Sequence, residues 1–215
     1  MREPEPLTVL VWSDVVCPFC YIGKRKLEHA LAEWPGRDRV RVVWKSFQLQ
    51  PDARTDPSKN AMQSLVERKG WTMEAARAAA ADVTARAKSV GLDFDLANTK
   101  VANTFDAHRL THLADARGHG DAMVERLFRA YFTEGSNVGD SATLSALATD
   151  VGLAAEEVER RLSTEAYAAE VRHDIDEALQ LGINGVPFFV FDGRYAVSGA
   201  QDVEVFLEVL RKVSG

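Results

Sequence analysis

The chain contains two cysteines, Cys17 and Cys20, and a Pro-Phe pair separates them. They lie in the segment DVVCPFCYIGKRKL, where an apolar run ends and a helical pattern begins. A thiol at a helix N-terminus meets unpaired backbone N–H groups and the positive end of the helix dipole, and both favour the thiolate. C-x-x-C pairs use this position for redox chemistry. The sequence therefore predicts a pair in which Cys17 attacks a disulfide and Cys20 resolves the mixed disulfide.

Two other interpretations of the cysteines stay open. Cys17 and Cys20 nominally form a Cys₂His₂ zinc set with His108 and His112, which share one face of a predicted helix. About 90 residues separate the two halves, against about 12–15 in a zinc finger, so no metal site is predicted. The two thiols could also be inert core residues. Cytosolic disulfides are mostly transient, catalytic or redox-sensing, so the redox interpretation is preferred.

The residues next to the cysteines fit an active-site turn. Pro18 is suited to the first position of a helix, because it has no N–H to satisfy and its φ is preset. Phe19 offers an apolar contact surface beside the sulfur of Cys17. Asp14 either relays protons or caps the helix. Pro18 and Phe19 are therefore candidate substrate contacts.

The elements that must position the pair can be read from hydrophobic periodicity. Residues 7–16 form a near-continuous apolar run typical of a strand buried on both faces. A helical pattern follows from Pro18 to Trp34 and ends at Pro35-Gly36, and residues 39–49 predict a second strand. This strand, helix and strand are close enough for a right-handed crossover between parallel strands.

Strand patterns vanish after Pro51 and return near residue 183. Helices are predicted between the stop signals over 72–91, 98–118, 121–135 and 141–152, with a last one ending at Gly182. Residues 186–191 and 194–199 then flank an Asp192-Gly193 turn, which predicts a hairpin. An amphipathic helix over 200–213 closes the chain.

This order predicts an α/β chain with a thioredoxin-like fold interrupted by an all-helical insertion domain. We expect residues 1–50 and 183–215 to form the thioredoxin-like domain and residues 51–182 to form the insertion. Folds of this type place a cis-proline against the active-site cysteines, and Pro187 stands at that position. The backbone of Val186 would then be free to pair with an extended substrate segment. The alternative is a trans proline that merely begins a strand.

Four motifs carry a resemblance to a known family: SDVVCPFCYIGKRKLE, NTFDAHRLTHLA, LFRAYFTEGSNVGD and INGVPFFVFDGRYAVSGAQ. Together they resemble the DsbA-like thioredoxin superfamily, and specifically its FrnE-type dithiol-disulfide oxidoreductases, over residues 9–209. The resemblance implies that Cys17 is an exposed nucleophile, Cys20 the resolving thiol and Pro187 the cis-proline. Some relatives carry a further cysteine pair toward the C-terminus, and this chain has none.

The resemblance also adds weight to Asn103 and His108 as residues that face the site. His108 shares a predicted helical face with His112, and this helix could overhang the cysteines. A histidine there would tune the thiolate or contact substrate, although a core histidine is the more common case. Residues 198–201, ahead of the last helix, could hold a glutathione carboxylate, but an ordinary helix start is favoured.

The expected function is a thiol-disulfide oxidoreductase of the reductase or isomerase type, acting on protein or small-molecule thiols and disulfides. No cofactor is expected, although glutathione could serve as a co-substrate. One alternative is a glutathione-dependent enzyme of the 2-hydroxychromene-2-carboxylate isomerase or kappa glutathione transferase type, in which a serine stands where Cys17 stands here. The other is a non-catalytic peptide-binding module, which would keep its activity without either cysteine.

Composition limits the other partners. The chain has 215 residues, 46% of them hydrophobic, and a formal net charge of −6, which argues against nucleic-acid binding. No run reaches the roughly 18 apolar residues of a membrane span, and the first residues lack the pattern of a secretory signal. We therefore expect a cytoplasmic protein with no membrane partner. The sequence does not indicate whether it is a monomer or a dimer.

Overall fold

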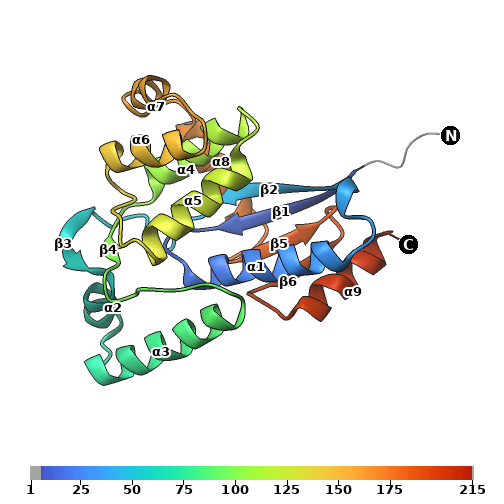
Figure 1. Ribbon diagram of the computed structural model, residues 1–215, viewed down its shortest axis with the longest axis horizontal. Helices are drawn as coiled ribbons and strands as arrows, with labels where there is room; N and C mark the ends of the chain where they lie inside the picture. The colour runs from blue at the N-terminus through green and yellow to red at the C-terminus, as the bar shows by residue number, and fades with distance from the viewer. Residues whose placement is uncertain (1–5, 215) are drawn as a thin grey trace.

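A mixed four-stranded sheet forms the centre of the computed structural model, which describes residues 6–214 (Figure 1). The strand order is β2-β1-β5-β6, with β1 at Leu7–Ser13, β2 at Val40–Ser46, β5 at Phe188–Phe191 and β6 at Tyr195–Ser198. Strands β1 and β2 are parallel, and β5 is antiparallel to both β1 and β6. The thioredoxin-like fold predicted from the sequence is confirmed. Residues 1–5 and 215 of the predicted domain ranges lie outside the described residues.

The local sequence explains the strands and the turn between β5 and β6. Strand β1 is apolar on both faces, and Val9 faces Val42 on one side and Phe191 on the other. At the hairpin tip, Asp192 has φ 54° and Gly193 has φ 66°. Positive φ at both central residues is the signature of a type I′ turn, whose twist matches that of the strands it joins. The predicted hairpin is therefore confirmed, with strands shorter than the predicted ranges.

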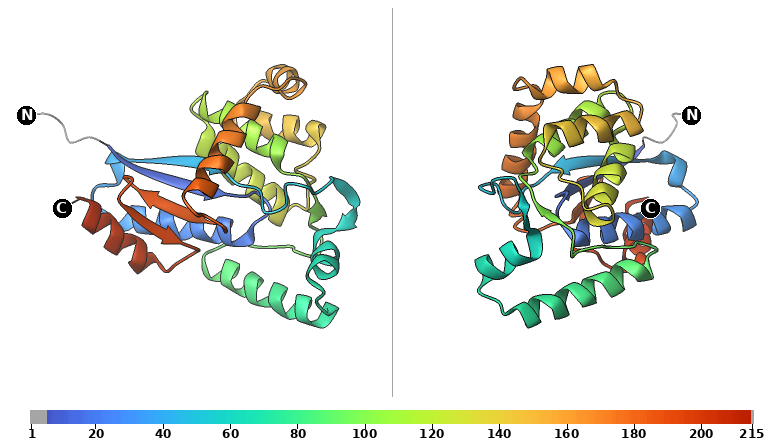
Figure 2. Two further views of the ribbon diagram at one scale, coloured as in Figure 1. Left: turned by 180° about the vertical axis from the view of Figure 1, so that it is seen from behind. Right: turned by 60° about the vertical axis from the view of Figure 1, so that its left-hand side comes forward.

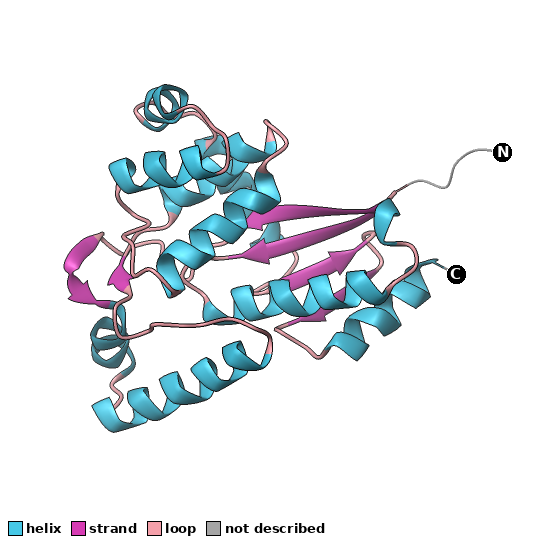
Figure 3. Cartoon of the chain, in the orientation of Figure 1, coloured by secondary structure: helices cyan, strands magenta, loops and turns pink. Residues whose placement is uncertain are grey.

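Helices cover both faces of the sheet, as the cartoon in Figure 3 shows. Helix α1 at Pro18–Glu33 connects β1 to β2 through a short 3₁₀ turn at Arg37–Arg39, and it packs with α9 at Val203–Ser214 on one face. Leu27 of α1 and Phe206 of α9 are buried in that layer. Helix α8 at Ala168–Gln180 covers the other face, where Ala178 packs in a cluster with Trp12 of β1.

The segment between β2 and α8 supplies six helices among the described residues, all within the predicted insertion, residues 51–182. These are α2 at Ala61–Lys69, α3 at Met73–Ser89, α4 at Phe105–Asp115, α5 at Gly120–Phe132, α6 at Ser141–Asp150 and α7 at Ala155–Leu162. Helices α4 to α7 gather on one side of the sheet, whereas α2 and α3 lie apart from them beyond the N-terminal end of α1 and below it (Figures 1 and 2).

The sequence predicts an all-helical insertion, and this prediction is wrong in one respect, because the insertion also contains two short strands. Strands β3 at Asp56–Asn60 and β4 at Lys100–Val101 form a two-stranded antiparallel ribbon. The sequence DPSKN of β3 has no apolar alternation, and β4 has two residues, so neither shows a strand pattern. The predicted helix over 98–118 is therefore wrong at its start, since α4 begins at Phe105.

The helix predicted to end at Gly182 is α8, which ends at Gln180, but the sequence did not indicate that α7 and α8 are separate helices. Tyr167, at the start of α8, has φ 61°, which interrupts helical geometry between them. The buried guanidinium of Arg109 donates to the backbone carbonyls of Arg161 and Ala166 at 2.9 and 2.8 Å. It thereby joins α4 to the end of α7 and to the segment that leads into α8.

The largest hydrophobic cluster crosses from α1 into the insertion. Cys20 and Tyr21 belong to the same cluster as Phe128 and Phe132 of α5, and the rings of Tyr21 and Phe128 stack with centroids 4.9 Å apart. The buried ammonium group of Lys24 lies 3.1 Å from Glu125 of α5. The N-terminal half of α1 is thus fixed by the insertion as well as by the sheet. Among residues 6–214, no helix has both the length and the apolarity needed to cross a membrane.

Candidate active site

Cys17 and Cys20 occupy the first turn of α1, directly after β1. Cys17 is the N-cap residue, with φ −92° and ψ 111°, and Pro18 follows at the first helical position. The backbone N–H of Cys17 donates to the carbonyl of Asp14 at 3.0 Å, and that of Cys20 donates to the carbonyl of Cys17 at 3.0 Å. Both cysteines are free thiols. This geometry puts the sulfur of Cys17 at the positive end of the helix dipole.

The expectation that Cys17 is exposed is wrong, because only 4% of the residue is accessible to solvent. The segment before β5 covers it: the Cys17 thiol donates to the carbonyl oxygen of Val186 at 3.4 Å. The Val186–Pro187 peptide bond is cis, as predicted. Pro187 also packs against α1, since a Cβ atom on Gly23 would lie 3.0 Å from its Cγ. Cys17 is reached through a cavity rather than from an open surface.

Cys20 lies deeper, with 1% of the residue accessible. Burial raises the pKa of its thiol well above the usual 9.0, and the hydrogen bond and the charge of Cys17 act in the same direction. The reduced protein therefore keeps Cys20 as a neutral thiol at pH 7. This asymmetry suits an outer sulfur that attacks and an inner sulfur that acts later.

A cavity of about 730 Å³ leads from Cys17 to helices α2 and α3. On the sulfur side it is lined by Cys17, Pro18, Phe19 and Val186. Its distant wall consists of apolar side chains from α2, α3 and the segments beside them, namely Met62, Leu65, Trp71, Ala79, Val83 and Leu96. Three of the predicted substrate contacts, Pro18, Phe19 and Val186, thus share one hollow with the predicted nucleophile.

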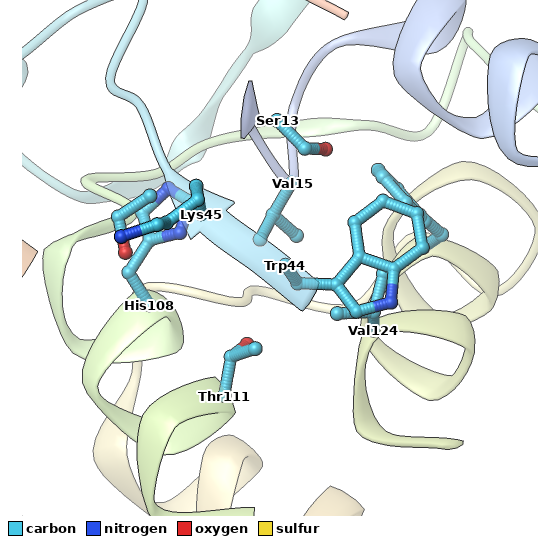
Figure 4. Close-up of a pocket in the computed structure, with 9 residues that line it drawn as sticks. Ser13, Val15, Trp44, Lys45, His108, Thr111 and Val124 are labelled. Carbon is cyan, nitrogen blue, oxygen red and sulfur yellow. The ribbon is translucent and has the colours of Figure 1, made fainter. Parts of the chain in front are cut away.

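His108 contacts Asp14, which precedes the cysteines, and it does not line the 730 Å³ cavity. It is buried, and its Nε2 is 3.5 Å from Oδ1 of Asp14, whose Oδ2 accepts a 2.7 Å hydrogen bond from the N–H of Leu49. Figure 4 shows His108 and Thr111 of α4 facing Ser13 and other residues around a separate cavity of about 20 Å³. This cavity is large enough for one water molecule. His108 therefore contacts the active-site turn from the protein interior.

Asn103 precedes α4 instead of lying within it, and it also does not line the large cavity. Its side-chain oxygen accepts from the N–H of Phe105 at 2.9 Å, and its amide nitrogen donates to the carbonyls of Pro51 and Ala53 at 3.2 and 2.8 Å. These bonds join the start of α4 to the segment after β2. Substrate contact by Asn103 or His108 stays a prediction.

His112 belongs to a different cluster from the cysteines. Its Nε2 lies 3.0 Å from Oδ2 of Asp174 and 3.2 Å from Oγ of Ser46, and Lys45 contacts Asp174 at 2.7 Å. This cluster connects α4, α8 and β2. Throughout residues 6–214, no group of three or more His, Cys, Asp or Glu side chains is arranged to hold a metal ion. The nominal Cys₂His₂ set is not brought together.

The segment before α9 does not line the large cavity either. The side-chain amide of Gln201 donates to the carbonyl of Ser198 at 2.9 Å, and α9 begins at Val203. Residues 198–201 thus form a turn ahead of the helix. A role for them in holding a carboxylate stays a prediction.

The cavity wall formed by α2 is not among the features predicted from the sequence. Met62, Leu65 and Lys69 follow one another at helical spacing, and Asn60 caps the helix by accepting from the N–H of Met62 at 2.8 Å. That spacing, with an Asn ahead of it and Gly70 behind it, was a readable helix signal. The sequence does not show that Met62 and Leu65 line the same cavity as Cys17.

Comparison with known proteins matches residues 8–211 to the model of the DSBA-like thioredoxin domain. An uncharacterised protein of Bacillus subtilis (strain 168), YwbO, is 31% identical over 206 residues, which cover 92% of each chain. A crystal structure titled as a probable DsbA oxidoreductase from Streptomyces coelicolor superposes with a TM-score of 0.92. It is 43% identical over 97% of this chain and 90% of its own.

A more distant structure shares the fold alone. The cytosolic disulfide reductase DsbM from Pseudomonas aeruginosa has a TM-score of 0.66 at 19% identity, covering 95% of this chain and 97% of its own. It has also been solved with glutathione. These similarities extend over nearly the full length of the chain and include both segments of the sheet and the insertion.

Proposed function

The chain belongs to the DSBA-like thioredoxin domain family, and on that premise we propose that it is a thiol-disulfide oxidoreductase acting through Cys17 and Cys20. The single observation that carries the proposal is the position of the two sulfurs. Cys17 sits at the N-terminus of α1 and lines a large cavity, while Cys20 lies buried one turn further along the same helix.

In the reductive direction, the Cys17 thiolate attacks one sulfur of a substrate disulfide and releases the first substrate thiol, which takes up a proton. Cys20 then loses its proton and attacks the sulfur of Cys17, so that the second substrate thiol leaves and a Cys17–Cys20 disulfide forms. Two electrons pass from the protein to the substrate. A thiol reductant of the glutathione class, acting as co-substrate, restores the dithiol by the reverse exchange.

We propose that Val186 and Pro187 align the substrate. The carbonyl oxygen of Val186 accepts a hydrogen bond from the Cys17 thiol at 3.4 Å. A substrate segment that pairs with the backbone of Val186 would therefore lie next to the attacking sulfur. An extended thiol or disulfide segment could add its backbone to Val186. Pro18 and Phe19 line the same end of the cavity.

We propose a cytoplasmic protein that works as a reductase or isomerase. A reducing compartment opposes the net formation of disulfides. The Pseudomonas structure, named a cytosolic disulfide reductase and also solved with glutathione, is consistent with this location and co-substrate.

A Cys20→Ser variant tests the mechanism. After attack by Cys17 the mixed disulfide cannot be resolved, so incubation with a disulfide substrate should leave a stable adduct on Cys17. Intact-mass measurement before and after reduction detects it. The matched Cys17→Ser variant should form no such adduct, because its remaining thiol is buried and kept neutral.

The two alternative functions give different results in the same assay. Absence of an adduct on Cys20→Ser would contradict thiol-disulfide exchange. Glutathione-dependent turnover that survives Cys17→Ser would instead indicate an isomerase or transferase. Peptide binding that survives loss of both cysteines, without any turnover, would indicate a binding module.

A further inference from the structure

The cavity beside Cys17 extends well past the sulfur, and helices α2 and α3 are built around it. No residue of α2 is buried, although Met62 and Leu65 point their apolar side chains toward the hollow. Ala79 and Val83 of α3 line the same hollow. An amphipathic helix normally buries its apolar face in a core. Here much of that face borders an open hollow that reaches the nucleophile.

The size of the hollow fits a small molecule. At about 730 Å³ it lies within the range of roughly 300–1,000 Å³ typical of sites that enclose drug-sized ligands. A short aliphatic disulfide would occupy only the end near Cys17 and Phe19. Trp71, Leu65 and Leu96 would then have no contact with the substrate, so the cavity fits a larger apolar or aromatic body.

Charge gives the second constraint on the occupant. Arg68, Lys69 and Lys100 line the cavity, against one carboxylate from Asp82. Among residues 6–214, Arg68 and Lys100 form no ion pair. The ammonium group of Lys69 lies 4.9 Å from the ring centroid of Trp71. The cavity therefore joins an apolar wall to cations that are free to bind an anion.

We propose that this cavity selects a low-molecular-weight disulfide with an aromatic or extended apolar body and a carboxylate or similar anionic group. The inference rests on the proposed function and names its substrate class. The apolar body packs between α2 and α3, the anion meets Arg68 or Lys100, and the disulfide reaches Cys17. The pair gives two electrons to the bond, two substrate thiols leave, and a glutathione-class thiol re-reduces the protein.

Binding can be measured apart from chemistry in a Cys17→Ser/Cys20→Ser protein, with the apolar sulfonate 8-anilinonaphthalene-1-sulfonate as the probe. Adding Ala79→Trp fills the cavity and should weaken binding at least about tenfold, as expected for loss of an apolar pocket. Adding Ala78→Trp, which places the same ring on the exposed outer face of α3, should change affinity by less than about twofold. Equal affinity in both proteins would overturn the proposal.

Selectivity is measured in the wild-type dithiol background, as rate constants for the reduction of three disulfides. The probes are 5,5′-dithiobis(2-nitrobenzoic acid), the neutral 2,2′-dithiodipyridine and the small 2-hydroxyethyl disulfide. Dividing each variant's rate by the wild-type rate removes intrinsic differences in reactivity. Ala79→Trp should slow both aromatic probes about tenfold and leave the small disulfide within about twofold.

The role of the cations is tested with Arg68→Glu in the same rate measurements. Arg77→Glu is the control, since Arg77 is exposed on α3 and does not line the cavity. At low ionic strength, Arg68→Glu should slow the dicarboxylate probe about fivefold and spare the neutral dipyridine. Equal loss on all probes, or no loss on any, overturns the inference. An equal loss on a disulfide-bonded peptide would also overturn it and assign the cavity to polypeptide.

The two proposals fail in different ways. If the wild-type protein reduces none of the three disulfides, the proposed function fails while the sulfonate-binding arm still decides whether the cavity takes an apolar anion. If the small disulfide is reduced normally and the cavity variants do not discriminate, only the substrate class is wrong.

Discussion

Cys17 and Cys20 differ in environment although they share one helical turn. Cys17 is the N-cap of α1, lines a cavity and contacts the Val186 carbonyl, whereas Cys20 is enclosed by α1 and the insertion. The spacing of the pair, the proline between them and Pro187 were readable from the sequence because their signals are local or tied to a fold pattern. The placement of His108 and Asn103 was not, since it depends on where α4 begins.

The raised pKa of Cys20 predicts a pH dependence of stability. Burial chiefly raises it above the usual 9.0, so the folded reduced protein holds this proton at pH values where the unfolded chain has lost it. The resulting stabilisation is complete below about pH 9 and is lost as pH rises toward the raised value. The free energy of unfolding of reduced wild type, minus that of Cys20→Ser, should fall by up to about 1.4 kcal/mol per pH unit in this window.

Urea unfolding between pH 7 and pH 10.5, in the presence of a phosphine reductant, measures this difference. The oxidised protein serves as the control, because its cysteines no longer titrate. A difference that stays constant across this range would show that Cys20 is not shielded as described.

At the scale of elements, the strands of the sheet were predictable and the ribbon of the insertion was not. Strand β1 is a near-continuous apolar run, β2 is rich in valine, and β5 and β6 flank an Asp-Gly turn, so each carries its own signal. Strand β3 is polar and pairs with a partner about 40 residues further on, which no local pattern reveals. The large cavity is harder still, because six separate stretches of the chain must assemble before it exists.

Helix α8 is held against β2 by a buried carboxylate, which gives a prediction for this contact. Burial acts to raise the pKa of Asp174, but hydrogen bonds from His112 and Lys45 outweigh it and hold the pKa below its usual 3.8. Asp174→Asn removes the buried charge that pairs with Lys45 and replaces one acceptor oxygen of the cluster by an NH₂ group, although Lys45 keeps Glu177 at 3.0 Å. It should lower the free energy of unfolding at pH 7 by about 2–4 kcal/mol.

The pH profile of the same variant provides a check. Because the folded-state pKa of Asp174 is lowered, its contribution is complete above about pH 3.8 and is lost as pH falls through the lowered value. The difference in the free energy of unfolding between wild type and Asp174→Asn should therefore become smaller below that pH. The matched Asp176→Asn variant, on the exposed side of α8, should stay within about 0.5 kcal/mol of wild type. Equal effects of the two substitutions would contradict this account.

At the scale of the whole molecule, the insertion and the sheet share one core. Tyr21 and Ile22 of α1 pack in the same cluster as Leu127 and Phe128 of α5. Separating the two parts would expose this cluster, including the wall behind Cys20. The sequence predicted an insertion from the change in periodicity at Pro51, but shared burial across that boundary is a property of the assembled chain.

This shared core predicts one cooperative unfolding transition despite the length of the chain. Far-ultraviolet circular dichroism follows the helices, most of which lie in the insertion, whereas tryptophan fluorescence includes Trp12 of the sheet. Urea curves from the two probes should coincide, with equal midpoints and slopes. Separate midpoints would indicate that residues 51–182 unfold on their own.

Helices α2 and α3 border the hollow next to Cys17, yet they bury only Ala76 and Ala87 between them. Little of the molecule's folding free energy depends on their identity. Residues 61–89 are consequently a natural cassette: a chimaera that carries another sequence over this stretch would keep the two sulfurs, the cis peptide bond and the sheet. Such a chimaera would keep the thiol-disulfide exchange of this chain and would take its substrate preference from the protein that supplies residues 61–89.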